Sequence, residues 1–225
     1  MSLPIPEVVP IPVGEFIIGA VPDDKFANTS EFPSHPVKMD TPFCLGRFPV
    51  RQDEWAAFAS SHRSASSSSR PAVNVSWADA NAYIAWLRYH TDDPNWRLPT
   101  EAEWEYACRA GQRTVFASGD NLSPDEANFH FDEAIQKVGP GSLTEVGAYP
   151  ANAWGVHDLH GNIYEWTCSP WRPDYESDSE PHRFVVRGGS WDGLPRLLRC
   201  SAREGLPAGT RRDNLGFRIA YGGEP

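Results

Sequence analysis

The stretch from Asn152 to Thr167 reads NAWGVHDLHGNIYEWT, an order typical of a tight loop that leads into a strand. Gly161 permits a backbone turn, and the apolar and aromatic residues after it favour a buried strand. The carboxylates of Asp158 and Glu165 bracket this turn. Calcium prefers carboxylate and carbonyl oxygens, so the loop predicts a hard-cation site to which Gly161 and Ile163 contribute backbone carbonyls. The alternative is that Glu165 only pairs with an arginine.

Helix-start signals lie upstream of this loop. Thr100 and Glu103 form a T-x-x-E capping box, and Gly111 is a C-terminal stop. Ser76 and Asp79 have the same spacing before a run of apolar residues at helical intervals. We therefore expect helices at about 52–60, 77–89 and 100–110.

Strand-like segments are short and separated by turns. Helices concentrated in the first half and short strands among loops in the second favour an α+β fold. A serine-rich linker is expected at Ser64 to Ser69. The predicted strands are Val8–Val13 and Glu15–Ala20, paired as a hairpin around Gly14, then Phe43–Val50, Asn162–Thr167, Phe184–Arg187 and Gly216–Ala220.

The composition indicates a globular chain. Forty per cent of the 225 residues are apolar, including nine Trp and eleven Phe, which supply large buried surfaces. A formal charge of −10 argues against nucleic acid as the main partner. Residues Met1 to Ala20 lack the basic start of a signal peptide, and no apolar run approaches the roughly 18 residues of a membrane span. We therefore expect a cytoplasmic chain without a membrane partner.

Cysteine and histidine spacing gives little support for a soft-metal site. His157 and His160 are three residues apart and could share a metal, but packing or surface histidines are the simpler interpretation. No C-x-x-C is present, which disfavours zinc and favours buried reduced thiols. The four cysteines are widely spaced, at Cys44, Cys108, Cys168 and Cys200.

Four segments, taken in order, resemble the sulfatase-modifying-factor family, which includes formylglycine-generating enzyme. The resemblance covers nearly the whole chain and implies a C-type-lectin-like α+β fold, loop-rich, with two main helices and short antiparallel strands. It further implies that residues 1–225 form one domain, that Gly188 and Gly189 provide special backbone geometry, and that Trp191 and Phe217 fill the core. The segments are RLPTEAEWEYA (97–107), the stretch 152–167, VRGGSW (186–191) and NLGFR (214–218), with a family-like start PVGEF (12–16).

The same resemblance identifies missing chemistry. Formylglycine-generating enzyme holds copper(I) with two thiolates that follow its GGS segment by a few residues. Here that segment continues as DGLPRLLRC, and its single cysteine, Cys200, resembles a third family cysteine outside the pair. We expect neither formylglycine generation nor copper. Related sulfoxide synthases of the ergothioneine pathway use iron with a helical domain carrying H-x-x-x-H-x-E, which is absent here, so iron is not expected either.

Calcium is the cofactor that the resemblance supports. Asp158, Gly161, Ile163 and Glu165 match a structural calcium site of the family position by position, with Asp158 where the family often has Asn. A sugar-binding loop of the E-P-N kind is not present, since the sequence from Glu180 to His182 lacks the amide. The calcium therefore has a structural role in this prediction.

The loops after Trp191 are the predicted binding face for a protein or small-molecule ligand. Their alternation of framework and unrestricted positions resembles the variable region of retroelement-diversified proteins, although ordinary loops would give the same pattern. We expect a non-catalytic binding module; the alternative is an oxidoreductase or other enzyme whose chemistry does not use a copper-binding cysteine pair. The expected exposed ligand-contacting residues are Asp192, Gly193, Leu194, Arg196, Leu197, Glu204, Leu206, Arg212 and Asp213.

Arginines give this segment a local positive charge. From Arg183 to Arg218 there are eight arginines and three acidic residues, an excess that could attract an anionic partner surface. The family resemblance assigns some arginines to the framework and leaves others exposed. We expect Arg187, Arg199, Arg203 and Arg218 to be structural, and Arg196, Arg211 and Arg212 to be more exposed.

Overall fold

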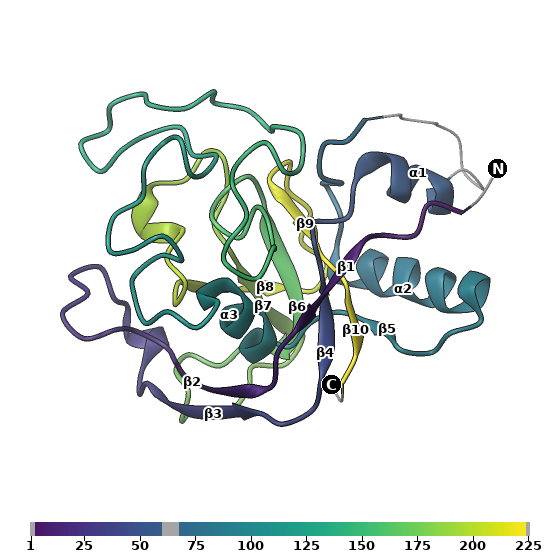
Figure 1. The fold of residues 1–225 in the computed structure, drawn as a ribbon, viewed down its shortest axis with the longest axis horizontal. Coiled ribbons are helices and arrows are strands. Elements are labelled where there is room, and N and C mark those ends of the chain that lie inside the picture. The colour runs from purple at the N-terminus through teal and green to yellow at the C-terminus, as the bar shows by residue number, and fades with distance from the viewer. Residues whose placement is uncertain (1–2, 60–67, 224–225) are drawn as a thin grey trace.

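The computed structural model describes residues 3–59 and 68–223, an α+β arrangement as predicted (Figure 1). The serine-rich segment lies mostly outside these residues. The helices are α1 (Gln52–Ala59), α2 (Trp77–Thr91) and α3 (Glu101–Arg109). The strands are β1 (Val8–Ile11), β2 (Gly14–Ile18), β3 (His35–Met39), β4 (Phe43–Gly46), β5 (Trp96–Arg97), β6 (Tyr164–Pro170), β7 (Arg183–Arg187), β8 (Arg203–Pro207), β9 (Leu215–Phe217) and β10 (Ala220–Gly222). A membrane-spanning helix would have to be longer and more apolar than any helix in the described ranges.

Both predicted capping boxes are present. The Ser76 hydroxyl accepts the Asp79 N–H, the Asp79 carboxylate accepts the Ser76 N–H, and Thr100 and Glu103 make the same reciprocal pair. These bonds satisfy N–H groups that have no partner within the helix. Helix α3 ends at Arg109, two residues before the predicted stop at Gly111, because Ala110 already adopts the left-handed conformation.

Three sheets organise the described strands, in the orders β1-β4-β10-β5, β2-β3 and β8-β7-β6-β9. The last strand, β10, is hydrogen-bonded between β4 and β5, so the end of the chain completes a sheet begun in its first half (Figure 1). The predicted hairpin around Gly14 is wrong in its pairing. Strand β1 pairs with β4 and β2 with β3, because the chain passes from one sheet to another at this glycine.

The predicted strand Gly216–Ala220 is divided in two. Strand β9 runs parallel to β6, and β10 lies in the other four-stranded sheet. Arg218 and Ile219 connect them, and the Arg218 side chain is fully buried between the sheets. Strands β3 and β8 were not predicted, since their sequences carry proline and charged residues rather than an apolar run.

The core of the described residues has two main clusters of buried side chains. One contains Trp166 and Phe217 with residues of α2, and the other contains Trp104 on α3 with Leu45 on β4. Gly188 and Gly189 have φ of 96° and 67°, which confirms their predicted backbone role. The core role predicted for Trp191 is only partly met, since its side chain is half-buried.

Candidate functional site

A buried ion pair occupies the predicted calcium loop. Arg218 donates two hydrogen bonds to the Glu165 carboxylate, at 2.6 and 2.7 Å, and the Trp104 indole N–H donates a third at 2.7 Å. All three side chains have 0% exposed surface. Arg218 also donates to the backbone carbonyls of Gly46 and His157. Its guanidinium therefore supplies the counter-charge of Glu165, which is the alternative arrangement that the sequence left open.

Asp158 lies in the same loop without such a partner among the described residues. Its φ is 57°, and its Oδ2 accepts the Gly147 N–H at 2.8 Å. Burial raises its pKa to about 6, because the charged form loses hydration. The Gly161 carbonyl accepts the Ile163 N–H at 2.8 Å. These residues fit calcium only in part, because Glu165 is already paired, and the calcium site stays a prediction.

The predicted ligand-contacting residues do not all reach the surface. Asp192, Arg196, Leu197 and Asp213 are exposed, and Leu194, Glu204 and Arg212 are partly exposed. Gly193 and Leu206 are buried, which corrects their expected exposure. Gly193 is held by its N–H on the Ser190 carbonyl, and Leu206 on β8 points into the core cluster beneath the sheet.

The predicted division of the arginines is confirmed. Arg187, Arg199, Arg203 and Arg218 have side-chain exposures of 4% or less, whereas Arg196, Arg211 and Arg212 have 39% or more. Each of the eight arginines from Arg183 to Arg218 forms an ion pair. All but one of these pairs use acids outside the segment, Arg212 with Glu204 being the exception, so much of its positive charge is paired within the chain. An anionic partner surface stays a prediction.

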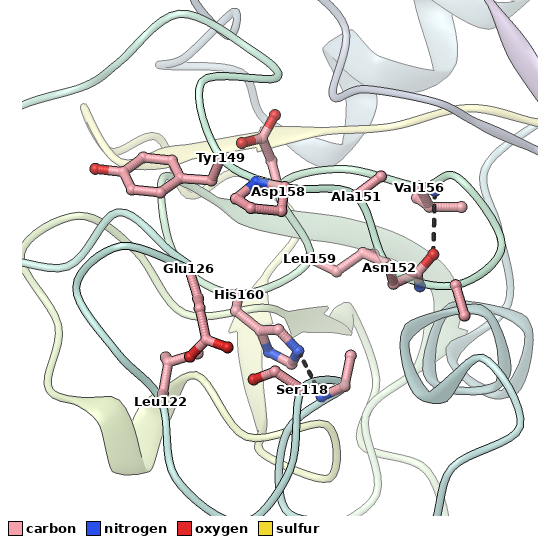
Figure 2. Close-up of a pocket in the computed structure, with 13 residues that line it drawn as sticks. Ser118, Leu122, Glu126, Tyr149, Ala151, Asn152, Val156, Asp158, Leu159 and His160 are labelled. Carbon is pink, nitrogen blue, oxygen red and sulfur yellow. Dashed lines mark hydrogen bonds between the residues drawn. The ribbon is translucent and has the colours of Figure 1, made fainter.

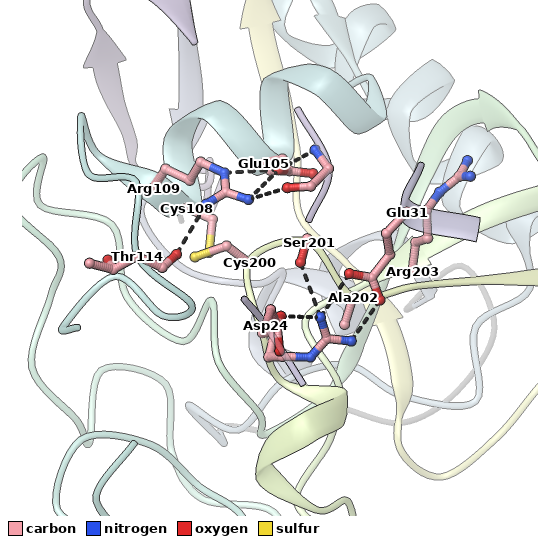
Figure 3. A network of polar contacts seen from close by, with 12 residues as sticks. Asp24, Glu31, Glu105, Cys108, Arg109, Thr114, Cys200, Ser201, Ala202 and Arg203 are labelled. Atoms are coloured by element: carbon pink, nitrogen blue, oxygen red, sulfur yellow. Dashed lines mark hydrogen bonds and ion pairs between the residues drawn. The ribbon is translucent and has the colours of Figure 1, made fainter. Parts of the chain in front are cut away.

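These pairs fix the loops to the core. Arg199 donates hydrogen bonds to Asp24 and Glu31, joining the C-terminal loop to the segment between β2 and β3. Figure 3 labels the two acids. Arg187 pairs with the fully buried Glu105 on α3, which Arg109 also contacts. Charged groups buried together in this way lose hydration but gain short, directed bonds, and removal of one partner leaves an isolated charge.

A cluster of sulfur and imidazole side chains lies beside this network. The Cys108 thiol on α3 donates to the Cys200 sulfur at 3.5 Å and lies 3.8 Å from His160 Nε2. Burial alone would raise the pKa of Cys200, but neighbouring contacts, above all the Cys108 hydrogen bond, hold it well below its ordinary value. Sequence spacing concealed this cluster, since Cys108 and Cys200 are 92 residues apart.

The two histidines do not share a ligand position. His157 Nδ1 bonds the Tyr149 carbonyl at 2.8 Å, and its ring packs against Phe48. His160 Nδ1 donates to the Leu198 carbonyl at 2.7 Å. The two rings thus take part in different interactions, so the pairing that their three-residue spacing allows is not formed.

His160 lines a pocket of about 220 Å³ (Figure 2). Asp158, Tyr149 and Glu126 contribute to the same walls. Burial raises the pKa of Tyr149 as it does that of Asp158. A pocket that brings together several groups with shifted pKa values is the feature that would distinguish an enzyme from a binding module.

A larger groove of about 620 Å³ lies beside the loop after Trp191. Pro195 and Arg196 form part of its wall, and Phe26 and Phe116 contribute aromatic surface. Its lining includes five carboxylates against one lysine and one arginine, which gives it an acidic balance. Loops without motif residues build most of this groove, so no sequence motif pointed to it. The carboxylates are Asp23, Asp24, Asp120, Asp132 and Glu133.

A family model described as a sulfatase-modifying factor enzyme 1-like domain matches residues 2–222. The chain belongs to this family. It is 38% identical to the formylglycine-generating enzyme of Streptomyces coelicolor over 175 residues, covering 67% of this chain and 52% of that one. It is 37% identical to the inactive C-alpha-formylglycine-generating enzyme 2 of Mus musculus over 161 residues, covering 67% and 48%. The chain spans from about a quarter to about half of the length of the curated relatives that it matches.

Solved structures support the expected fold. PvdO from Pseudomonas aeruginosa superposes with a TM-score of 0.83 at 30% identity, covering 96% of this chain and 94% of that one. Treponema denticola variable protein 1 superposes with a TM-score of 0.78 at 24% identity, covering 95% and 94%, which shows the fold alone. The formylglycine-generating-enzyme type of C-type-lectin-like fold is thereby confirmed.

Proposed function

We propose that this family member is a non-catalytic binding module whose ligand occupies the acidic groove beside Arg196. The segment where the family carries its catalytic thiols supplies instead a wall of this groove. Pro195 begins a short 3-10 helix there, and Leu198 and Arg199 are buried beneath it. The single cysteine of the segment, Cys200, is buried against Cys108. The groove is therefore the observation that supports a ligand-binding role for this segment, where the family's enzymes carry copper-binding thiols.

The charges of the groove favour a cationic ligand, such as an amine or a guanidinium group. Arg196 is already paired with Glu133, with its Nη1 3.1 Å from the carboxylate, and Asp24 is paired with Arg199. Asp23 and Asp120 have no basic partner within the described residues. Carboxylates that focus a negative potential on a hollow raise the local concentration of cations.

Titration calorimetry with arginine amide and spermidine tests this proposal. Asp23→Asn together with Glu133→Gln should weaken binding of the cations, while Asp178→Asn, an exposed acid outside the groove, should not. Arg196→Ala should leave cation binding unchanged or stronger, because it frees Glu133. Weaker cation binding by Arg196→Ala, or equal binding by the double variant, would contradict the proposed charge selectivity.

Absence of oxidase chemistry is tested separately. Purified protein with copper(I), oxygen and a cysteine peptide of the sulfatase type should leave the peptide mass unchanged. The Streptomyces coelicolor relative serves as the positive control. Turnover of the peptide by this chain would overturn the non-catalytic assignment.

An enzyme of other chemistry is the second candidate. Its support is the pocket that joins Asp158, Tyr149 and His160, two of which have pKa values raised by burial as stated above. If a substrate is found, Asp158→Asn should abolish its turnover while cation binding in the groove is retained. If Asp158→Asn left both the turnover and the cation binding unchanged, this candidate would be rejected.

Retroelement diversification is a finer form of the binding proposal. In its favour, Asp192, Arg196, Leu197 and Asp213 lie on the surface after the GGSW segment. A neighbouring reverse-transcriptase gene and a template repeat would support it. Their absence from the genomic neighbourhood would count against it.

A further inference from the structure

Cys108, His160 and Cys200 form a compact group of soft ligands outside the groove and the predicted calcium loop. Their ligand atoms all lie within 4.8 Å of one another. Three distant parts of the chain supply them: α3, the loop before β6, and the turn after the 3-10 helix at 195–197. Figure 3 shows Cys108 and Cys200 side by side, and Figure 2 shows His160 on the pocket wall.

Two of the three separations between the ligand atoms are close to those around one tetrahedral ion, and the third is below 4.8 Å. Zinc bound at about 2.3 Å to sulfur and about 2.0 Å to imidazole holds two sulfurs about 3.8 Å apart and sulfur and nitrogen about 3.6 Å apart. Here Sγ of Cys108 is 3.5 Å from Sγ of Cys200 and 3.8 Å from Nε2 of His160. Both cysteines are free thiols, because the distance between their sulfur atoms is well beyond the roughly 2.05 Å of a disulfide bond.

The imidazole is held in the orientation that a zinc ligand needs. His160 Nδ1 donates to the Leu198 carbonyl at 2.7 Å, which leaves the lone pair on Nε2. A backbone carbonyl on the second nitrogen is the usual support for a metal-binding histidine. The Nε2 lone pair accepts the Ala117 N–H at 3.0 Å. Coordination would replace this hydrogen bond and the thiol hydrogen bond from Cys108 to Cys200, each of which is far weaker than a zinc site.

We propose that Cys108, Cys200 and His160 bind one Zn²⁺ ion as two thiolates and one imidazole, with water at the fourth position. Both sulfurs have 0% exposed surface, so two thiolates would be costly there without a cation. Among the described residues no other His, Cys, Asp or Glu joins the three within the same reach. Three protein ligands with one open position are the pattern of reactive rather than purely structural zinc sites.

The test uses the full chain, reduced with a phosphine and freed of metal. Competition against a chromophoric chelator should show one equivalent of tightly bound Zn²⁺, and Co²⁺ should give a thiolate-to-metal charge-transfer band. Cys108→Ser, Cys200→Ser and His160→Asn should each weaken binding by at least about 100-fold, since loss of an outer partner alone costs about 10- to 100-fold. Cys44→Ser, Cys168→Ser and His157→Asn are matched controls that should keep wild-type affinity.

A measurement on the unmodified chain covers the case in which a buried substitution prevents folding. Zn²⁺ should slow alkylation of Cys108 and Cys200, followed by mass spectrometry of peptides, and leave Cys44 and Cys168 unchanged. Failure of the reduced chain to bind Zn²⁺ would overturn the proposal. Equal binding by folded Cys108→Ser and Cys200→Ser variants, or alkylation of these two thiols that Zn²⁺ does not slow, would overturn it as well.

Discussion

Removal of Arg218 should be among the most damaging single changes in this chain. Arg218→Ala leaves the Glu165 carboxylate buried with no counter-charge and breaks donations to Gly46 and His157. Loss of one partner of a buried ion pair costs about 3 to 5 kcal/mol in free energy of unfolding. At roughly 2 to 4 °C per kcal/mol for a chain of this size, the melting temperature should fall by about 6 to 20 °C.

Urea unfolding followed by the fluorescence of the nine tryptophans measures this loss. Arg212→Ala is the matched control, because its pair with Glu204 is about 40% exposed on both sides and should cost at most about 1 kcal/mol. The Arg218→Met and Glu165→Gln double variant should recover part of the loss, since it leaves no unpaired charge. The reasoning is refuted if Arg218→Ala costs less than 1 kcal/mol, or if calcium restores its stability fully, which would make Glu165 an ion ligand instead.

Three further outcomes are expected. The pKa of Asp158 is about 6 in the folded chain and about 3.9 in the unfolded chain, so the folded state binds the proton more tightly between these values. With a chelator present, the free energy of unfolding should therefore fall by up to about 3 kcal/mol as the pH rises from about 4 to above 6. Asp158→Asn should remove that slope; an unchanged pH profile contradicts the assignment. If calcium binds the loop, it should raise the melting temperature of wild type and not of Asp158→Asn, whereas identical melting curves in calcium and chelator reject the site. Arg211→Ala, which breaks an exposed pair with Asp79, should change stability by no more than about 1 kcal/mol in urea titration, and a loss as large as that of Arg218→Ala would refute its peripheral role.

Features of the fold that neighbouring residues decide could be predicted from the sequence. The capping boxes at Ser76 and Thr100 were identified correctly because both halves of each box lie within one helical turn. The framework arginines were separated from exposed ones by their place in motifs. Pairing of β1 was mistaken, because period-two patterns mark a strand without naming its partner.

The sequence by itself determined the family, the positions of the main helices, and the absence of a thiol pair after the GGSW segment. Tertiary structure alone decided that Glu165 meets Arg218, that Cys108 meets Cys200 beside His160, and that acidic loops close a groove around Arg196. The first group depends on short motifs, each made of residues within a few positions of one another, and on the order of these motifs along the chain. The second depends on contacts between segments tens to well over a hundred residues apart. Burial of the shared core and the cost of leaving a charged group unpaired in it select the partners.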